Sequence, residues 1–346
     1  MVPTDGSGPQ LPPGRTAGSA AAAATTELHL HLEGSLQPQR AWALWQAAKH
    51  VPPLPSGSLL EAGPPPRWRF STLRGFLELF GWATRLLRGV DQYAQLLEDL
   101  LEELDSEGVH YAELFVAIGQ MLRTGVDPHA VLPRLAEMAA ERAQAGGPEV
   151  WFVADLTRQW GVRAAEAVLD AALSLQRHRI VGLGMGGDET ALRARDFRRV
   201  YRRAAENGLT LSCHAGEGTT ADLVREAVEE LEVSRIGHGI AAADDERLMR
   251  ELREAGVVLE VCPTSNERTG AWDPQRGPHP IHRLLAHDVP VVLGTDDPGF
   301  FACTLRSERQ RLLDWGIAAT VLEDLECRAR RVRMVPEDSR AETGRD

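Results

Sequence analysis

Histidines and carboxylates that could do chemistry fall at the ends of short apolar runs in this 346-residue chain. In Glu27-Leu-His-Leu-His31, His29 and His31 stand two residues apart. Side chains of a strand alternate between its two faces, so both imidazoles point the same way. Two imidazoles on one face near a strand end can share a metal ion. The pattern is weak by itself, because two solvated polar residues have the same spacing.

A second apolar run, Leu209–His214, also ends in a histidine, and Glu217 follows it closely. Alternation places Ser212 and His214 on one face and the apolar Leu211 and its neighbours on the other. The apolar face is expected to pack under helices, which turns His214 toward the interior. Glu217 is then either a catalytic carboxylate or a cap of the next helix.

Two further strand ends add a histidine and a pair of aspartates. His238 stands between glycines that allow close backbone approach, although a lone histidine here can also be a hydrogen-bonded core residue. Asp296 and Asp297 follow the apolar run 289–295, where buried carboxylates are costly without a cation or hydrogen bonds. Asp-Asp-Pro is also a common turn. Combined with three inward histidines, Asp296 completes three nitrogens and one oxygen, a set that suits zinc with a water at an open position.

The single lysine of the chain bears on how many metal ions such a site holds. A two-metal site bridged by a carboxylated lysine needs a lysine inside the fold. Lys49 is the only lysine, and it falls on the first predicted helix, about Pro38 to His50. The sequence therefore predicts one zinc ion per chain.

These residues are positioned by an alternation of apolar runs with segments of helical period. Eight runs predict strands: Glu27–His31, His110–Val116, Val150–Asp155, Ile180–Gly184, Leu209–His214, Arg235–His238, Val257–Val261 and Val289–Thr295. Helical stretches between them include 127–144, 162–177, 197–207, 221–230 and 244–254. Eight strands alternating with helices favour an α/β fold of the (β/α)8 TIM-barrel type over an open sheet. The polar clusters fall at the carboxyl ends of the strands, where barrel enzymes have their active sites.

The predicted domain organisation is one barrel with flanking tails. Residues 1–26 are of low complexity and are expected to be a disordered tail. Residues 27–330 form the barrel domain, with a helical insertion after the first strand, at about 51–107, that could lie over its mouth. Helical patterns at Leu73–Leu87 and Asp91–Glu107 belong to this insertion. Residues 331–346 are expected to be a polar tail.

Composition excludes several classes of partner. The net charge of −12 argues against a nucleic-acid backbone as partner. Apolar runs stay short of the roughly 18 residues that a membrane span needs, and the amino terminus does not resemble a signal peptide. The four cysteines are scattered and show no C-x-x-C spacing. We therefore expect reduced thiols in a cytoplasmic protein.

Six motifs in order, each after its own predicted strand, resemble the adenosine and adenine deaminase family of metal-dependent hydrolases. They are ELHLHLEGS, GLGMGGDE, SCHAGE, IGHG, VCPTSN and GTDDP, and the resemblance covers roughly Glu27 to Leu325. Each motif is weak alone, but six in this order are highly specific.

The resemblance implies a role for each matching residue. His29, His31, His214 and Asp296 resemble the zinc ligands, with His31 also next to the substrate. Glu217 resembles the acid that protonates purine N1, and burial should therefore raise its pKa. His238 resembles the residue that orients or deprotonates the attacking water. Asp297 resembles the group that holds this water and purine N7, and Gly187 resembles the backbone donor to N3.

The motifs leave the exact substrate open. Glu33 occupies the position of an aspartate that faces the ribose 5′ end in the best-known adenosine deaminases. Adenine deaminases and relatives resembling aminodeoxyfutalosine deaminase have glutamate there. The resemblance implies zinc-dependent hydrolysis of the 6-amino group of adenosine or a 5′-modified adenine nucleoside, a small-molecule substrate. Adenine deaminase is the alternative within the class, and a non-catalytic zinc- or nucleoside-binding paralogue is the alternative outside it.

Overall fold

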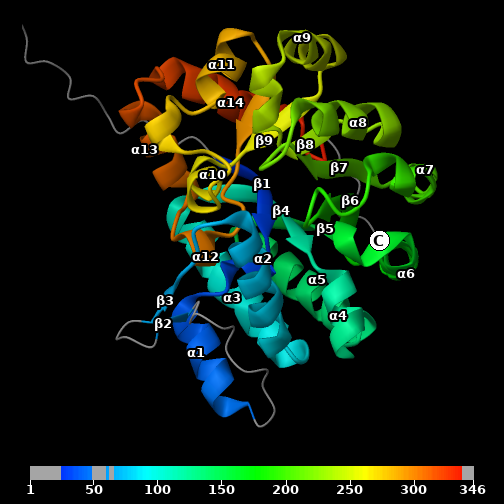
Figure 1. Cartoon of the computed structure of the whole chain (residues 1–346). Coiled ribbons are helices and arrows are strands. Elements are labelled where there is room, and N and C mark those ends of the chain that lie inside the picture. The colour runs from blue at the N-terminus through cyan, green and yellow to red at the C-terminus, as the bar shows by residue number, and fades with distance from the viewer. Residues whose placement is uncertain (1–24, 49–59, 62–65, 337–346) are drawn as a thin grey trace, which may run out of the picture.

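Eight parallel strands form a barrel in the computed structural model, which describes residues 25–48, 60–61 and 66–336 (Figure 1). Their order around the barrel is their order along the chain. The strands are β1 (Thr25–His31), β4 (Val109–Val116), β5 (Glu149–Thr157), β6 (Ile180–Gly186), β7 (Thr210–Ala215), β8 (Arg235–His238), β9 (Val258–Val261) and β10 (Val291–Leu293). All eight predicted strands and the (β/α)8 fold class are confirmed.

Helices surround the barrel and connect its strands. They are α1 (Pro38–Ala47), α2 (Leu73–Ala83), α3 (Val90–Glu107), α4 (Ile118–Thr124), α5 (Pro128–Gln144), α6 (Gly161–Ser174), α7 (Arg198–Glu206), α8 (Ala221–Leu231), α9 (Glu246–Ala255), α10 (Pro263–Arg268), α11 (Ile281–Ala286), α12 (Pro298–Phe301), α13 (Leu305–Asp314) and α14 (Ala319–Arg331). Short 3₁₀ turns are η1 (Glu33–Ser35), η2 (Thr84–Leu86), η3 (Arg158–Trp160), η4 (Ala194–Phe197), η5 (Ile240–Asp244) and η6 (Pro274–Arg276). Among the described residues, none of the helices has the length and apolar character needed to cross a bilayer.

Local sequence explains where several helices begin and end. The Asp245 side chain accepts hydrogen bonds from the backbone amides of Arg247 and Leu248, which satisfies two free donors at the start of α9. The same helix ends at Gly256, whose φ of 70° is easily adopted only by glycine. The following strand, β9, then starts two residues later.

The barrel closes at the residues predicted to bind metal. The His31 amide donates to the Asp296 carbonyl at 2.8 Å, and the Asp296 amide donates to the His29 carbonyl at 2.8 Å. A parallel bridge between Leu30 and Asp296 completes this closure. The backbone of β1 is thereby joined directly to the residue that follows β10.

The described residues of the insertion between β1 and β4 cover one side of the barrel mouth. It contains α1, the hairpin of β2 (Leu60–Glu61) and β3 (Arg67–Trp68), α2 and α3. The Trp68 ring stacks on Phe300 of α12 at 4.7 Å, which holds the hairpin against the barrel. In Figure 1, α2 and α3 lie in front of the strands and α1 projects away from them. Residues 49–59 and 62–65, and with them Lys49, lie outside the described residues.

The described residues of the predicted polar tail, up to residue 336, contact the barrel. The Met334 amide donates to Glu113 at 2.6 Å, and the Val335 amide donates to the Tyr111 hydroxyl at 3.2 Å. Arg333 donates to Thr26 at 2.8 Å. This segment therefore packs across the amino-terminal end of the barrel. Residues 1–24 and 337–346 lie outside the described residues.

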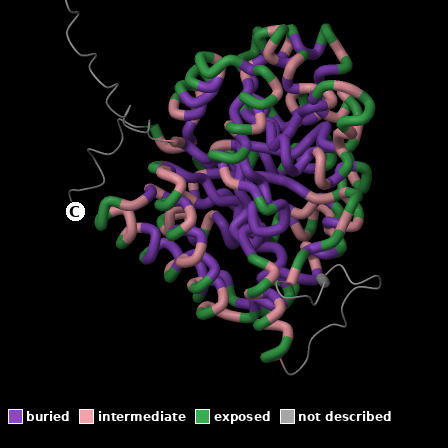
Figure 2. The backbone as a smooth tube through the Cα atoms, turned by 90° about the vertical axis from the view of Figure 1, so that its left-hand side faces the viewer, coloured by how far each residue is buried: buried purple, intermediate pink, exposed green. Residues whose placement is uncertain are grey.

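Charged residues fill the barrel interior below the mouth, within the buried centre that Figure 2 shows in purple. Arg235 is fully buried, with Nη1 at 2.6 Å from Glu113 and Nε at 2.5 Å from Glu260. Arg235 also donates to the Leu28 carbonyl at 3.2 Å. Burial opposes ionisation of Glu260, but the Arg235 charge and the hydrogen bond from His29 keep its pKa below the ordinary value.

Removing the Arg235 charge should strongly destabilise the barrel. Arg235→Met leaves two buried carboxylates without their cation, and we expect the free energy of unfolding to fall by about 3–5 kcal/mol. Urea denaturation measures this change. Arg247→Met, which removes one partner of the exposed Arg247–Glu251 pair, should shift it by less than about 1 kcal/mol. Equal effects of the two substitutions would contradict this role of the buried charges.

Candidate active site

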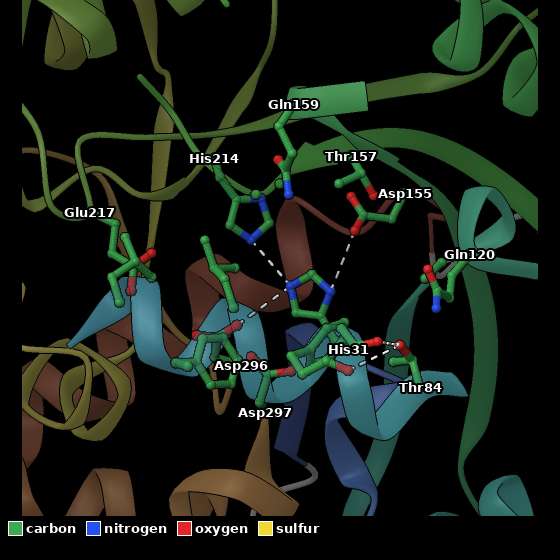
Figure 3. Close-up of a pocket in the computed structure, with 18 of the residues that line it drawn as sticks. His31, Thr84, Gln120, Asp155, Thr157, Gln159, His214, Glu217, Asp296 and Asp297 are labelled. Carbon is green, nitrogen blue, oxygen red and sulfur yellow. Dashed lines mark hydrogen bonds and ion pairs between the residues drawn. The ribbon is translucent and has the colours of Figure 1, made fainter. Parts of the chain in front are cut away.

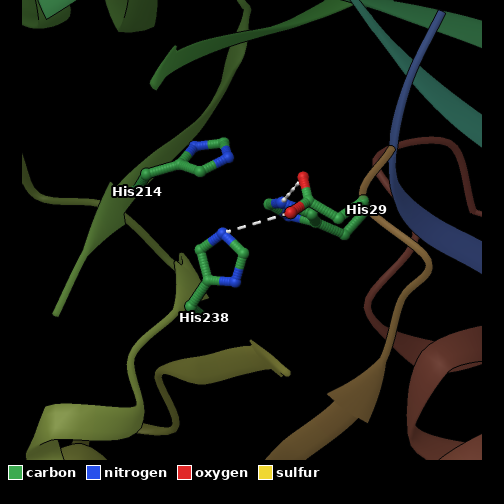
Figure 4. Close-up of side chains that lie close together, drawn as sticks. His29, His214 and His238 are labelled. Atoms are coloured by element: carbon green, nitrogen blue, oxygen red, sulfur yellow. Dashed lines mark ion pairs between the residues drawn. The ribbon is translucent and has the colours of Figure 1, made fainter. Parts of the chain in front are cut away.

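The structure brings the predicted metal-binding residues together at the carboxyl ends of three strands, and Figure 4 shows His29 and His214 beside His238 of a fourth strand. His29 and His31 lie at the end of β1, His214 near the end of β7, and Asp296 just after β10. His31 Nε2 lies 3.2 Å from His214 Nε2. Asp296 Oδ1 lies 3.4 Å from His31 Nε2 and 3.7 Å from His29 Nε2. His238, at the end of β8, places its Nε2 at 3.8 Å from Asp296 Oδ2.

Hydrogen bonds on the far side of the rings determine which nitrogen faces the centre. His29 Nδ1 donates to the Glu260 carboxylate at 2.6 Å, and His214 Nδ1 donates to the Met185 carbonyl at 3.1 Å. With a metal ion bound, each ring would be neutral and would present an unprotonated Nε2 to the centre. His29 Nε2 is buried and has no hydrogen-bond partner among the residues that the structure describes. Such orphaned lone pairs, with a second partner holding each ring, are typical of metal ligands.

The charges of the cluster also favour a cation. Burial opposes protonation of His29, but Asp296 and Glu260 outweigh it and raise its pKa to about 10. Burial lowers the pKa of His31 to about 3 and that of His214 well below its ordinary value. Burial opposes ionisation of Asp296, yet the surrounding imidazoles hold its pKa well below the usual range. The cluster is therefore arranged around one positive charge.

Two overlapping groups of atoms have the spacing that a metal site requires. One group is His29, His214, His238 and Asp296, and the other is His31, Asp296 and Asp297. Within each group the potential ligand atoms lie within 4.8 Å of one another. The first group has three imidazole nitrogens and one carboxylate, a donor set that fits zinc, but it contains His238 where the predicted ligand set has His31. The residues present therefore suit the metal that the sequence predicted.

The backbone around these residues adopts conformations that glycine tolerates better than other residues. His238 has a φ of 59° and Asp296 a φ of 64°, both in the left-handed region. A Cβ atom on Gly237 would lie 2.7 Å from the His29 ring, so only glycine fits beside it. Such strain at non-glycine residues is common in functional sites.

Helix α10 supplies three hydrogen bonds to the site. Ser265 donates to Asp296 at 2.5 Å, and Thr269 donates to Glu217 at 3.1 Å. The Asn266 amide lies 3.2 Å from His238 Nδ1. Our sequence interpretation assigned no role to these residues. Their signal was present, because Ser265 and Asn266 belong to the VCPTSN motif at the end of the seventh barrel strand.

Glu217 lies on the loop after β7, beside His238. Its Oε2 is 3.7 Å from His238 Nε2, and the backbone amide of Glu217 donates to Glu189 at 3.1 Å. Burial, followed by the charges of Asp296 and Glu189, raises the pKa of Glu217 well above its ordinary value, as the sequence predicted. Glu189 was not predicted, although it follows Gly187 in the GGDE motif.

A pocket of about 770 Å³ opens above the cluster (Figure 3). Its polar lining includes Asp297 and Gly187, both predicted to contact substrate. Asp155, which we did not predict, also lines it, with Oδ2 at 3.7 Å from His31 Nδ1. The apolar wall comes from α2 and η3: Leu73, Phe76, Leu77, Phe80 and Trp160.

Glu33 is not among the residues that line the pocket, although its position in the family motif implied that it faces the ribose 5′ end. The side chain is buried, and both carboxylate oxygens accept a hydrogen bond from the Ala117 amide, at 3.1 and 3.2 Å. Burial raises its pKa to about 7. The free amide after β4 attracts this carboxylate away from the pocket. Ala117 itself lines the pocket, so Glu33 supports the wall from behind.

An eight-stranded barrel with a histidine–aspartate centre at the carboxyl ends of its strands defines the class of the protein as a metal-dependent hydrolase. A sequence model of the adenosine deaminase family matches residues 24–343. The chain therefore belongs to the adenosine deaminase family, hydrolases that act on carbon–nitrogen bonds.

Individual relatives resemble the chain over most of their length. An adenine deaminase of Chelativorans sp. is 34% identical over 91% of this chain and 95% of its own. An aminodeoxyfutalosine deaminase of Acidothermus cellulolyticus is 36% identical over 86% of this chain and 87% of its own. The crystal structure of an adenine deaminase from Arthrobacter aurescens superposes with a TM-score of 0.82 at 28% identity, covering 92% of this chain and 95% of that one.

Metal content tests the site geometry directly. The purified protein should contain close to one zinc ion per chain, because the two candidate groups share Asp296. His214→Ala removes one ligand and should lose most of the metal, whereas His129→Ala, at an exposed histidine outside the pocket, should keep it. Elemental analysis after gel filtration measures both. Two tightly bound ions, or a fully loaded His214→Ala, would contradict the assignment.

Proposed function

We propose that the protein uses one zinc ion to hydrolyse the 6-amino group of adenosine or a 5′-modified adenine nucleoside, such as aminodeoxyfutalosine. Water and the 6-aminopurine are consumed, and ammonia and the 6-oxopurine are released. The observation that supports this proposal most is the convergence of unprotonated imidazole nitrogens and Asp296 beside the buried carboxyl of Glu217. His29, His31, His214 and Asp296 would hold the metal, which at such sites supplies an ionised water at neutral pH.

Glu217 is the proposed general acid. Attack at C6 puts electrons onto the purine ring, and a proton at N1 neutralises them. Burial keeps the Glu217 carboxyl protonated, and the Thr269 hydroxyl holds Oε1 in place. The Glu217 carboxyl can therefore deliver this proton.

Two further residues are proposed to orient the substrate. Asp297 lines the pocket, and its carboxyl is proposed to face purine N7. Burial and the Asp296 charge raise the pKa of Asp297, which gives it a proton to donate. Gly187, with a φ of 97° at the end of β6, exposes backbone that can donate to N3.

The shape of the pocket favours a nucleoside over a free base. It extends from the metal ligands to the apolar wall of α2. The Glu33 carboxylate accepts a hydrogen bond from the Ala117 amide, so it is not in a position to bind a 5′-hydroxyl. An apolar or bulky 5′ substituent is therefore the better match for this wall. The resemblance to the Acidothermus cellulolyticus enzyme supports this choice.

Adenine deaminase activity is the second candidate. The relative from Chelativorans sp. is named adenine deaminase, and its match covers 91% of this chain, against 86% for the Acidothermus cellulolyticus enzyme. A binding protein without activity is a third, weaker candidate. The described site contains every group that the hydrolysis requires, from the ligands to Glu217 and Asp297.

Replacing the general acid should separate catalysis from metal binding. Glu217→Gln keeps the shape of the side chain but cannot deliver a proton, so we expect kcat to fall about 10²–10⁴-fold with zinc content unchanged. In the parent enzyme the protonated form is active, so kcat/KM should fall as pH rises through the raised pKa of Glu217. A Glu217→Gln variant that kept more than a tenth of the parent rate would require another proton donor.

A substrate panel distinguishes the candidates. Adenine, adenosine, 5′-deoxyadenosine, 5′-methylthioadenosine and aminodeoxyfutalosine are followed by the absorbance change of deamination. We expect 5′-substituted nucleosides to be turned over at least as well as adenosine, and adenine poorly, because of the apolar wall. Adenine as the best substrate would establish the alternative, and a complete lack of turnover by zinc-loaded protein would favour the binding protein.

A further inference from the structure

The hydrogen bonds behind His238 differ from those behind the proposed metal ligands. His29 and His214 donate from Nδ1, which leaves Nε2 unprotonated. At His238 the group facing Nδ1 is the side-chain amide of Asn266, at 3.2 Å. An amide can turn either its oxygen or its nitrogen toward a neighbour, so the proton on His238 depends on what orients Asn266.

His279 orients this amide. The Ile281 backbone amide lies 3.1 Å from His279 Nδ1, and a backbone N–H can only donate, so this nitrogen is unprotonated. The neutral ring then has its proton on Nε2, which lies 3.3 Å from Asn266 Oδ1. The Asn266 oxygen must face His279, since the reversed amide would bring two donors together.

The proton position at His238 follows. With its oxygen on His279, Asn266 presents its NH₂ group to His238 Nδ1, which must accept. The only proton of the His238 ring is then on Nε2, the nitrogen that faces Glu217 and Asp296. A nitrogen that already bears a proton donates hydrogen bonds and does not accept a proton.

The surroundings hold this relay in one arrangement. His279, Asn266 and His238 are all buried, so water does not compete for these bonds. The His279 ring stacks on Trp315 at 5.2 Å and meets the edge of Trp272 at 5.0 Å. Both contacts limit rotation of the ring.

We propose that His279 is a positioning residue that acts through Asn266 to keep the His238 proton on Nε2. His238 then orients the attacking water as a donor and is not its base, and the proton that this water loses passes to solvent before attack. The role of His238 toward the attacking water rests on the proposed deamination. The position of the proton on His238 Nε2 does not depend on it.

Proton positions can be measured in the intact protein without any substrate. Long-range ¹H–¹⁵N correlation spectra of ¹⁵N-histidine-labelled, zinc-loaded enzyme report which ring nitrogen is protonated. Signals are assigned by their loss in His279→Leu and His238→Gln. We expect protonated Nε2 and unprotonated Nδ1 at both residues. A proton on Nδ1 of either histidine in the parent enzyme would overturn the proposal, whatever the substrate proves to be.

Kinetics test the role of His279. His279→Leu frees the Asn266 amide to rotate, and we expect kcat to fall about tenfold, the effect of one hydrogen bond at the reacting centre, with KM changed less than about twofold. His279→Gln retains a donor and an acceptor and should recover most of this loss. His282→Leu, at a neighbouring ring near the same Trp315, should leave kcat unchanged. Equal kcat losses in His279→Gln and His279→Leu, or no loss in either, would contradict the relay.

Discussion

The organisation of the site depends on imidazole nitrogens that the barrel brings together in a buried place. His31 Nε2 and His214 Nε2 face each other at 3.2 Å, and His29 Nε2 points buried and unpaired toward the same region. Each ring is fixed there by its strand, and for His29 and His214 also by a hydrogen bond from Nδ1. Without a cation the His31 and His214 rings can share one hydrogen bond, whereas His29 Nε2 has no hydrogen-bond partner among the described residues. The fold is therefore preorganised for a positive ion.

A chain of buried charges connects this centre with the opposite end of the barrel. Glu260 accepts from His29 and faces Arg235, which in turn faces Glu113. Glu113 also accepts the amide of Met334 in the carboxyl-terminal segment. With Asp296, the three carboxylates exceed the guanidinium by two negative charges. A divalent cation held by the histidines would balance these two charges.

The parts of the fold that the sequence predicted are those that a local pattern determines. Alternation within 27–31 and 209–214 was enough to turn His29, His31 and His214 inward, since a strand has only two faces. Glu33 was misplaced because its partner is the Ala117 amide, 84 residues away in the chain. Strand neighbours such as Arg235 and Glu260 were missed because their pairing depends on the register of β8 against β9. Polar residues such as Asn266 resemble ordinary helix-start residues until the fold places a histidine beside them.

Chemistry and substrate choice depend on different parts of the molecule. The groups proposed to react lie on strand ends and are held by α10, where Ser265, Asn266 and Thr269 each bond a different one. Such short, buried supports keep reacting atoms within a narrow range of positions. The apolar wall comes instead mainly from α2 in the insertion, which carries no proposed metal ligand. Changes in α2 can therefore alter which purine substrate fits the pocket while the groups proposed for deamination stay the same.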